Sequence, residues 1–205
     1  MGRMEKIKRV LSSSYYRLNI RKYRELIDYD YRFNASFRGS DKLSKREMNS
    51  VEIKYLRCYR KCQAYKGSVW GDIAYLKLKK LSRKTGIDLY ENLNIGKGLV
   101  IGHWGRIVMN GGARFGNEIM LTHNVTIGRD VRGKRKGSPT IGNRVCIRAN
   151  SCVVGNITIG DDVLIAPNTF VNFDVPSHSI VVGNPASIHH RENATEGHLG
   201  IVKQE

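Results

Sequence analysis

The chain has 205 residues, and 35 lysines and arginines against 18 aspartates and glutamates give it a formal net charge of +17 at pH 7. With 40% hydrophobic residues it can bury a core, so wholesale disorder is excluded, and its length predicts one domain with at most a small addition. No apolar run approaches the roughly 18 residues of a membrane-spanning helix, and residues 1–24 lack the apolar segment of a secretory signal.

The positive charge is concentrated in the first part of the chain. Residues 1–90 hold 23 lysines and arginines against 9 acidic residues, whereas residues 91–205 hold 12 against 9. A helix of less regular pattern is expected between residues 5 and 29. Apolar residues recur at steps of three and four over residues 44–66 and again over 71–84, which predicts two amphipathic helices, the second ended by Gly86. We therefore predict a basic α-helical domain over residues 1–84.

The basic face of this domain leaves two interpretations open. It is either a solvated surface or a binding surface for an anionic partner, such as an acidic glycan, lipid headgroups or nucleic acid. The sequence contains no zinc-finger, RNP-like or basic-zipper pattern, and its tyrosines follow helix-core spacing. We therefore expect no nucleic-acid partner, while peripheral association with a membrane surface stays open.

From residue 95 onward, aliphatic residues recur at every sixth position. The period slips by two residues after Ile107 and is interrupted between Ile127 and Ile141 by a basic loop, residues 129–136. Its members are Ile95, Ile101, Ile107, Phe115, Leu121, Ile127, Ile141, Ile147, Val153, Ile159, Ile165 and Val171. Such a period is typical of a β-helix, in which one residue per repeat points inward and glycine, asparagine or aspartate forms the corners. We predict a mainly β fold, with a β-helix over residues 85–186 and a polar tail over 187–205.

The repeats, the length of the loop between Ile127 and Ile141, and the closing sequence Gly183-Asn184-Pro185-Ala186 resemble the hexapeptide-repeat acyltransferases. Within them, the chain is similar to the serine acetyltransferase branch, which includes sugar O-acetyltransferases of capsules and O-antigens. The resemblance covers residues 85–186. It implies a left-handed parallel β-helix, acetyl-CoA as co-substrate, and a homotrimer with active sites between adjacent subunits.

Two residues match the catalytic pair of this family. Transfer of an acetyl group to a hydroxyl needs a base beside that hydroxyl and a partner that orients the base. His103 stands at the position of the family's general base, and Asp88, fifteen residues earlier, at that of the orienting aspartate. The resemblance implies that His103 accepts the proton of the hydroxyl while Asp88 fixes the imidazole tautomer. The alternative is that His103 is an exposed corner residue.

The same resemblance implies further binding residues. Candidates for contact with the acceptor are Gly102, Trp104, His123 and Ser138. Candidates for contact with coenzyme A are Ala149, Asn150, Ala166, Pro167, Gly183 and Pro185, with Arg191 or Arg148 as a partner for the nucleotide phosphates. For His123 and both arginines, plain exposure to solvent is the alternative.

We expect no metal ion and a reducing, cytoplasmic environment. The histidines of the repeats form no H-x4-H pair of the kind found in zinc-binding β-helices. The four cysteines form neither a disulfide framework nor a C-x2-C zinc pattern; they are Cys58, Cys62, Cys146 and Cys152.

The chain departs from the serine acetyltransferases where they hold the amino acid. They carry an aspartate before the catalytic histidine and an Arg-His pair before a proline, whereas this chain has Gly102 and Gly137-Ser138. Charge-assisted contacts worth about 1.5–3 kcal/mol each are then missing. With Trp104 as an apolar platform, this predicts transfer to a sugar or a capsular or O-antigen polysaccharide, and the basic loop favours an anionic one. The alternatives are a serine O-acetyltransferase of cysteine biosynthesis and a non-catalytic trimeric scaffold.

Overall fold

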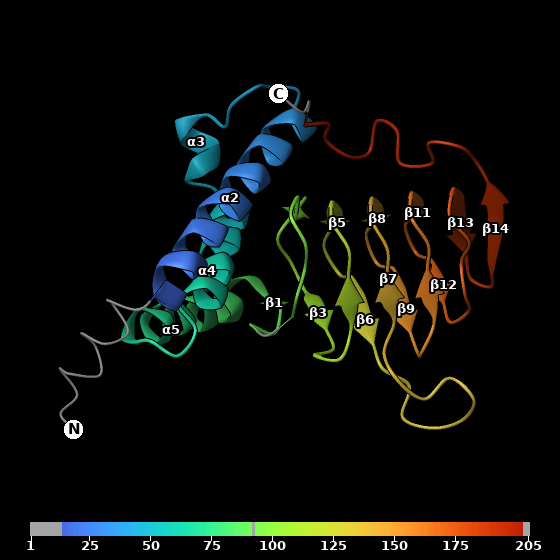
Figure 1. Ribbon diagram of the computed structural model, residues 1–205. Helices are drawn as coiled ribbons and strands as arrows, with labels where there is room; N and C mark the ends of the chain where they lie inside the picture. Colours follow the sequence, from blue (N-terminus) through green and yellow to red (C-terminus); the bar gives the residue numbers. More distant parts are fainter. Residues whose placement is uncertain (1–13, 92, 203–205) are drawn as a thin grey trace.

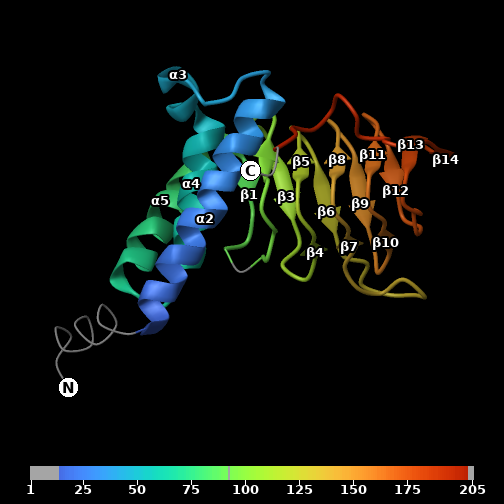
Figure 2. The same ribbon diagram turned by 45° about the horizontal axis from the view of Figure 1, so that its top comes forward.

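The computed structural model describes residues 14–91 and 93–202, and it consists of a helical bundle joined to the end of a β-helix (Figure 1). The helices of the bundle are α2 (Ser14–Phe37), α3 (Lys45–Met48), α4 (Val51–Ala64) and α5 (Val69–Thr85). Helix α4 packs against both α2 and α5, and Figure 2 shows these three long helices beside the first strands. No helix within the described ranges is long and apolar enough to cross a bilayer.

The helices differ in their bounds from those expected. Helix α2 continues eight residues past the predicted end at residue 29, and the predicted residues 5–13 lie outside the described part. The single helix expected over residues 44–66 is two helices, because Ser44 and Ser50 each accept a hydrogen bond from the backbone of the turn that follows. Gly86 ends α5 in the left-handed conformation (φ 73°), as its position predicts.

Three parallel sheets stack coil on coil to form the β-helix. Sheet A contains β1 (Ile87–Asp88), β3 (Ile107–Met109), β6 (Thr126–Gly128), β9 (Cys152–Val154) and β12 (Phe170–Val171). Sheet B contains β2 (Val100–Ile101), β5 (Ile119–Leu121), β8 (Val145–Ile147), β11 (Val163–Ile165), β13 (Ser179–Gly183) and the antiparallel β14 (Ala186–His190). Sheet C contains β4 (Arg114–Phe115), β7 (Thr140–Ile141) and β10 (Thr158–Ile159).

The inward positions of the six-residue period form the core of the β-helix. Eleven of the twelve are buried, and the exception is the half-buried Phe115, which lies on the edge strand β4 of sheet C. A ladder of polar side chains connects successive coils at one corner. Asn117 accepts from the backbone of Lys97, Asn143 accepts from Asn117, and Asp161 accepts from Asn143. Short polar side chains recur at this corner because they satisfy backbone N–H groups that the turn leaves without a partner.

The outer face of sheet B is also buried, which the six-residue period does not predict. Val100, Met120, Cys146 and Leu164 form a row that points outward, and they pack against Phe33 of α2 and against Leu199. Leu199 belongs to residues 191–202, here called the C-terminal strap, which return from the last coil along sheet B toward α2 (Figure 1). At the far end, the backbone N–H of Ile201 donates to Ser36 Oγ at 2.9 Å.

Asp162 anchors the near end of the strap. Its carboxylate accepts the backbone N–H groups of Ala194 and Thr195 at 2.9 and 3.0 Å and the Thr195 hydroxyl at 2.6 Å. His178 Nδ1 lies 3.0 Å from the same carboxylate. Burial favours a raised pKa for Asp162, but the hydrogen bonds from Thr195, His178 and Ala194 hold the pKa below its ordinary value.

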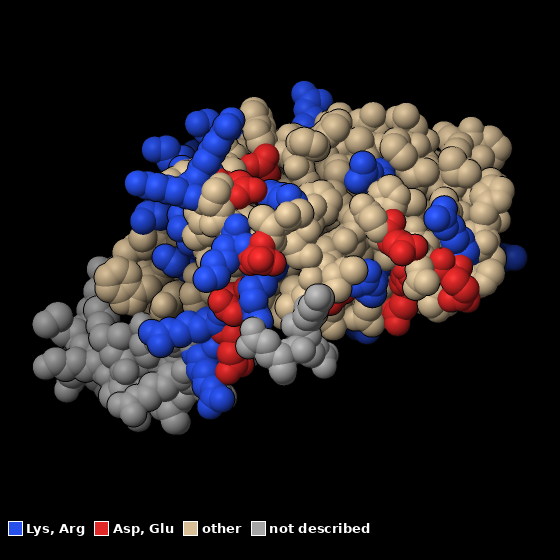
Figure 3. Space-filling model, turned by 90° about the horizontal axis from the view of Figure 1, so that it is seen from above, with Lys and Arg blue, Asp and Glu red and all other residues tan. Residues whose placement is uncertain are grey.

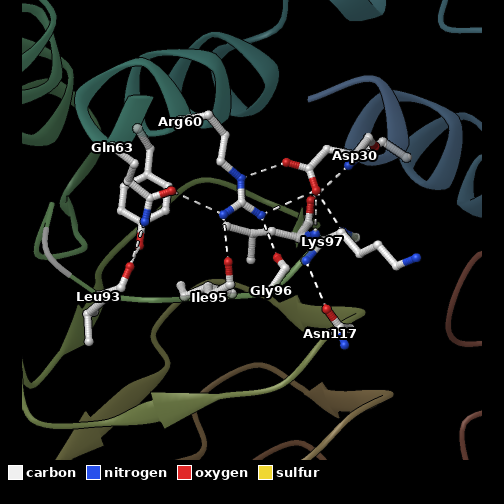
Figure 4. A network of polar contacts seen from close by, with 12 residues as sticks. Asp30, Arg60, Gln63, Leu93, Ile95, Gly96, Lys97 and Asn117 are labelled. Carbon is white, nitrogen blue, oxygen red and sulfur yellow. Dashed lines mark hydrogen bonds and ion pairs between the residues drawn. The ribbon is translucent and has the colours of Figure 1, made fainter. Parts of the chain in front are cut away.

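A buried ion pair joins the helical bundle to the first coil of the β-helix (Figure 4). Arg60 of α4 donates to the carboxylate of Asp30 of α2 at 2.8 Å, and both side chains are fully buried. Arg60 also donates to the carbonyls of Ile95 and Gly96, at 2.7 and 2.6 Å. Asp30 accepts the backbone N–H groups of Gly98 and Leu99, at 2.7 and 3.1 Å. Two helices and residues 95–99 are therefore held by one network.

We expect Arg60→Met to reduce the free energy of unfolding by about 3–5 kcal/mol, because it leaves the Asp30 carboxylate buried without its counter-ion. The double variant Asp30→Leu/Arg60→Met removes both charges and should recover part of that loss. Urea unfolding followed by circular dichroism measures both, with Arg21→Met as the control in an exposed ion pair. A loss below about 1 kcal/mol for Arg60→Met would show that the network adds little to stability.

We expect Asp162→Asn to lower the free energy of unfolding at neutral pH by about 2 kcal/mol, because the strap loses charge-assisted hydrogen bonds. Since the folded-state pKa lies below the unfolded value of about 4, this stabilisation is complete above that value and is lost as the pH falls through the folded-state pKa. The difference between wild type and variant should therefore shrink in acid. Urea titrations at neutral and at acid pH measure this difference in the free energy of unfolding, with the exposed Glu192→Gln as the control. A difference that does not change with pH contradicts the role given to the Asp162 carboxylate.

Candidate functional site

Most of the predicted site residues lie along one edge of the β-helix. At this edge, here called the A–B edge, the chain passes from sheet B to sheet A through residues 102–106, 122–125, 148–151 and 166–169. The turn 183–185 connects β13 to β14 within sheet B and lies at the same edge, where the backbone N–H of Gly183 donates to Thr169 Oγ1. Successive coils therefore bring together residues that are far apart in the sequence. Of the candidates, the A–B edge contains Gly102, His103, Trp104, His123, Ala149, Asn150, Ala166, Pro167, Gly183 and Pro185.

His103 and His123 are neighbours at the end of this edge near the helices. Their ring centroids are 6.0 Å apart and the rings meet edge to face. His103 is exposed, and the adjacent Trp104 is 52% exposed. Gly105 follows with φ 143°, and a Cβ atom there would lie 2.9 Å from His123 Cβ, so glycine allows this corner to lie directly against the next coil. The backbone N–H groups of Trp104 and Gly105 have no hydrogen-bond partner within the described residues.

Asp88 lies in β1, one coil away from the corner that contains His103. Its side chain is on the outer face of sheet A, in register with Val108 of β3. The carboxylate lies 3.7 Å from Lys79 Nζ of α5, and both side chains are substantially exposed. Within the described residues it makes no hydrogen bond to His103, so the structure brings the pair to the same end of the β-helix without joining them directly.

Two of the candidates lie at other corners. Ser138 lies where the chain passes from sheet A to sheet C, and its hydroxyl donates to Asn110 Oδ1 at 2.8 Å. Arg191 lies where sheet C leads into sheet B, with its backbone N–H donating to the carbonyl of His178 at 2.8 Å. Within one chain, therefore, neither residue is placed beside His103 or the rest of the A–B edge.

Of the two arginines suggested for the nucleotide phosphates, Arg148 is the one that lies on the A–B edge, directly after β8. The strap brings His198 close to it, and burial lowers the pKa of His198, with the positive charges of Arg148 and Arg191 lowering it further. The sequence pattern did not indicate that the strap returns along sheet B, because the strap follows the last repeat and has no period of its own. The sequence signal for this packing is the pair of apolar residues Leu199 and Val202, which pack on sheet B.

The small residues of the A–B edge suit a long, flexible ligand. Ala149, Ala166 and Pro167 leave the backbone of successive corners accessible, and Asn150 and Asn168 adopt the left-handed conformation that turns the chain there. Arg148, which directly follows β8, adds a positive charge to this edge. The described residues contain no cluster of three or more His, Cys, Asp or Glu side chains that could hold a metal ion.

Comparisons with known proteins agree on one family. The family described as bacterial transferase hexapeptide (six repeats) matches residues 138–172. The serine acetyltransferase of Helicobacter pylori is 38% identical over 135 residues, which are 65% of this chain and 78% of that protein. Serine acetyltransferase 2 of Arabidopsis thaliana is 34% identical over 147 residues, 68% of this chain, but the match spans only 45% of the plant protein.

Solved structures give the same result. The serine acetyltransferase of Neisseria gonorrhoeae in complex with serine superposes with a TM-score of 0.68 and 26% identity, covering 85% of this chain and 73% of that one. The soybean apoenzyme gives a TM-score of 0.67 and 27% identity, covering 82% and 69%. The predicted left-handed β-helix with preceding helices is confirmed.

These comparisons correct the predicted acceptor. A sugar or polysaccharide was inferred from the absence of an aspartate at Gly102 and of an Arg-His pair at Gly137-Ser138, yet these relatives, at 34–38% identity, are named serine acetyltransferases. The inference was wrong because the loss of the aspartate and the Arg-His pair does not identify another acceptor, since cations and aromatic rings elsewhere in a site can bind the same groups. The prediction of an acyltransferase of the hexapeptide-repeat class is confirmed, and the chain belongs to the serine acetyltransferase family.

Proposed function

We propose that this protein transfers the acetyl group of acetyl-CoA to the hydroxyl of serine. The observation that carries the proposal is His103, exposed on the A–B edge at the position of the family's general base, in a chain 38% identical to a serine acetyltransferase. The small residues of the later corners would hold the pantetheine chain of acetyl-CoA, and Arg148 would contact its phosphates. The thioester would then reach the corner formed by residues 102–106.

In the proposed step, His103 takes the proton of the serine hydroxyl as the oxygen attacks the thioester carbonyl. The negative charge that develops on the carbonyl oxygen needs donors with no other partner, and the N–H groups of Trp104 and Gly105 meet that requirement within the described residues. The tetrahedral intermediate collapses by breaking the C–S bond, and the imidazolium returns its proton to the sulfur. The products are O-acetylserine and coenzyme A.

Asp88 would orient His103, as its counterpart does in the family. In this structure its carboxylate contacts Lys79, so the proposed role requires the Asp88 side chain to leave that exposed ion pair for the imidazole. Because an exposed ion pair of this kind contributes little stability, breaking it costs little free energy. A carboxylate that accepts the imidazole N–H would stabilise the imidazolium formed during transfer.

Trp104 and Arg106 are the residues that we propose to hold the ammonium and carboxylate groups of serine. Both are exposed and lie on the same corner as His103. The face of an indole ring attracts an ammonium group, and a guanidinium forms paired hydrogen bonds with a carboxylate. Within the described residues Arg106 forms no ion pair, which leaves its guanidinium available. These two side chains would replace the charged groups missing at residues 102, 137 and 138.

We also propose a homotrimer with active sites between subunits. The outer face of sheet A supports it, because Val108 and Phe170 are exposed there in one row, with the exposed Thr126 and the half-buried Cys152 between them. Sheet B is less suited to such contact, since α2 and the strap already cover it. An apolar face on parallel strands is best buried against another subunit.

His103→Ala should reduce kcat for the release of coenzyme A from acetyl-CoA and serine by about 10²–10⁴-fold, the usual contribution of a general base. A thiol reagent detects the released coenzyme A. His189→Ala, an exposed histidine of β14 outside the A–B edge, is the matched control and should retain full activity. Wild-type protein that releases no coenzyme A with serine would refute the proposed function.

Arg106→Gln should raise the KM for serine by about 10- to 100-fold while changing the KM for acetyl-CoA little, because a charged hydrogen bond to the serine carboxylate is lost. Initial rates at varied serine measure the change. Arg114→Gln, which changes another exposed arginine, in sheet C, is the control. An unchanged KM for serine would exclude Arg106 from the acceptor site without affecting the role of His103.

A further inference from the structure

Helix α5 exposes large apolar side chains on one face. Trp70 is 56% exposed and Leu76 is 68% exposed, and Val69 and Ile73 lie on the same face at helical spacing. The opposite face of the helix, with Ala74 and Leu78, is buried against the bundle. A cluster of exposed apolar residues on one helical face is typical of a binding surface rather than of plain solvated surface.

Positive charges surround this apolar face. A cavity of about 450 Å³ between α4 and α5 is lined by Trp70 and Ile73 together with Arg57, Lys61 and Lys77. None of the three cations has a carboxylate within 4.0 Å in the described part of the chain. Continuing along α5, the exposed cations of the last turns are Lys80, Arg83 and Lys84.

The positive charges of the three cations in the cavity all reach the same side chain, Cys58. Burial raises the pKa of the Cys58 thiol, and the charges of Arg57, Lys61 and Lys77 all oppose that rise. Figure 3 shows that lysines and arginines gather over the helical end of the molecule, whereas the visible face of the β-helix carries fewer charged side chains, of both signs. The cavity therefore combines converging positive charge with an adjacent apolar surface.

We propose that this face of α5 binds the surface of an anionic membrane. The cavity formed by Arg57, Lys61 and Lys77 would receive a lipid phosphate, and Trp70 and Leu76 would enter the boundary between headgroups and acyl chains. An amphipathic helix that carries lysines and a tryptophan binds in this position through apolar burial and attraction to acidic lipids together.

A second copy of the chain is the competing occupant, and charge argues against it. Residues 1–90 carry an excess of +14, so two copies meeting through α5 would bring like charges together. Asp72 is the only acidic residue within α5 and cannot neutralise a facing set of lysines. An anionic surface satisfies the apolar and the basic groups at once.

Sedimentation with vesicles tests the proposal on the full chain. Wild-type protein should bind vesicles of phosphatidylcholine mixed with phosphatidylglycerol and bind pure phosphatidylcholine vesicles much more weakly. Leu76→Glu should weaken binding to the mixed vesicles at least about tenfold. Lys61→Gln/Lys77→Gln should weaken it by roughly 25-fold, since each basic residue near such a surface contributes about fivefold.

Matched controls come from the exposed loop of the β-helix. Val131→Glu changes an apolar residue of similar exposure, 62%, and Lys134→Gln/Arg135→Gln removes the same charge from the loop. Both controls should bind vesicles like wild type. A Trp104→Phe variant, which leaves Trp70 as the single tryptophan, should also bind, and the fluorescence of Trp70 should shift to the blue on binding. The α5 and loop variants should release coenzyme A at the wild-type rate if the two sites are independent, so a failure of lipid binding is distinguishable from a failure of catalysis; Trp104→Phe is used for fluorescence alone, because Trp104 belongs to the proposed acceptor site.

Three results would overturn the proposal. The first is absence of binding to the mixed vesicles. The second is equal weakening by the α5 and loop charge variants, which would indicate attraction by net charge alone. The third is a Leu76→Glu variant that binds vesicles like wild type but has a different oligomeric state by analytical ultracentrifugation. This result would show that α5 is an interface between copies of the chain.

Discussion

The buried pair of Asp30 and Arg60 is the constraint on which the arrangement of the molecule depends. A fully buried charge is stable only when it is paired and hydrogen-bonded, and here the required partners come from two helices and from the backbone of residues 95–99. The bundle therefore cannot shift on the β-helix without breaking several of these bonds. Because β2 follows directly, the same network determines where the corner with His103 begins.

The sequence predicted the β-helix well because its information is local. An aliphatic residue at every sixth position, with glycine or asparagine at the corners, specifies each coil through contacts with the coils above and below. The same periodicity placed His103 and the later candidates on corners, and the structure gathers most of them on one edge. It gives no information where no repeat applies, as in the basic loop of residues 129–136, where the apolar Val131 is exposed.

Contacts between distant segments could not be predicted in this way. Asp30 and Arg60 resemble ordinary charged residues of amphipathic helices, and nothing in their spacing shows that they meet the backbone of residues 95–99. The strap was likewise described only as a polar tail, although Leu199 packs on the outer row of sheet B. That row of Val100, Met120, Cys146 and Leu164 has a signal of its own, since outward positions of a solvated sheet are seldom all apolar. The lysine contact of Asp88 has no sequence signal at all.

The acceptor shows a different limit of sequence reasoning. Gly102 was interpreted as a lost contact, and the structure adds that a Cβ atom there would lie 2.8 Å from the end of the Met120 side chain and 3.1 Å from Thr122 Cγ2. A side chain at this position would require the flexible end of Met120 to move, and the groups that we propose to hold the substrate come from elsewhere in this chain. An absent side chain indicates how a site differs from its relatives, whereas only the side chains that are present indicate what it binds.

The C-terminal strap changes how the β-helix should open. In a stacked array each coil contacts only its neighbours, so the terminal coil is normally free to fray without disturbing the rest. Here Asp162 holds the strap at the last coils while Ser36 and Phe33 hold its other end at α2. The linear stack is thereby closed into a ring of contacts. Amide protons of β11 and β13 should then exchange with solvent together with those of α2 rather than ahead of them, as parts of one cooperative unit.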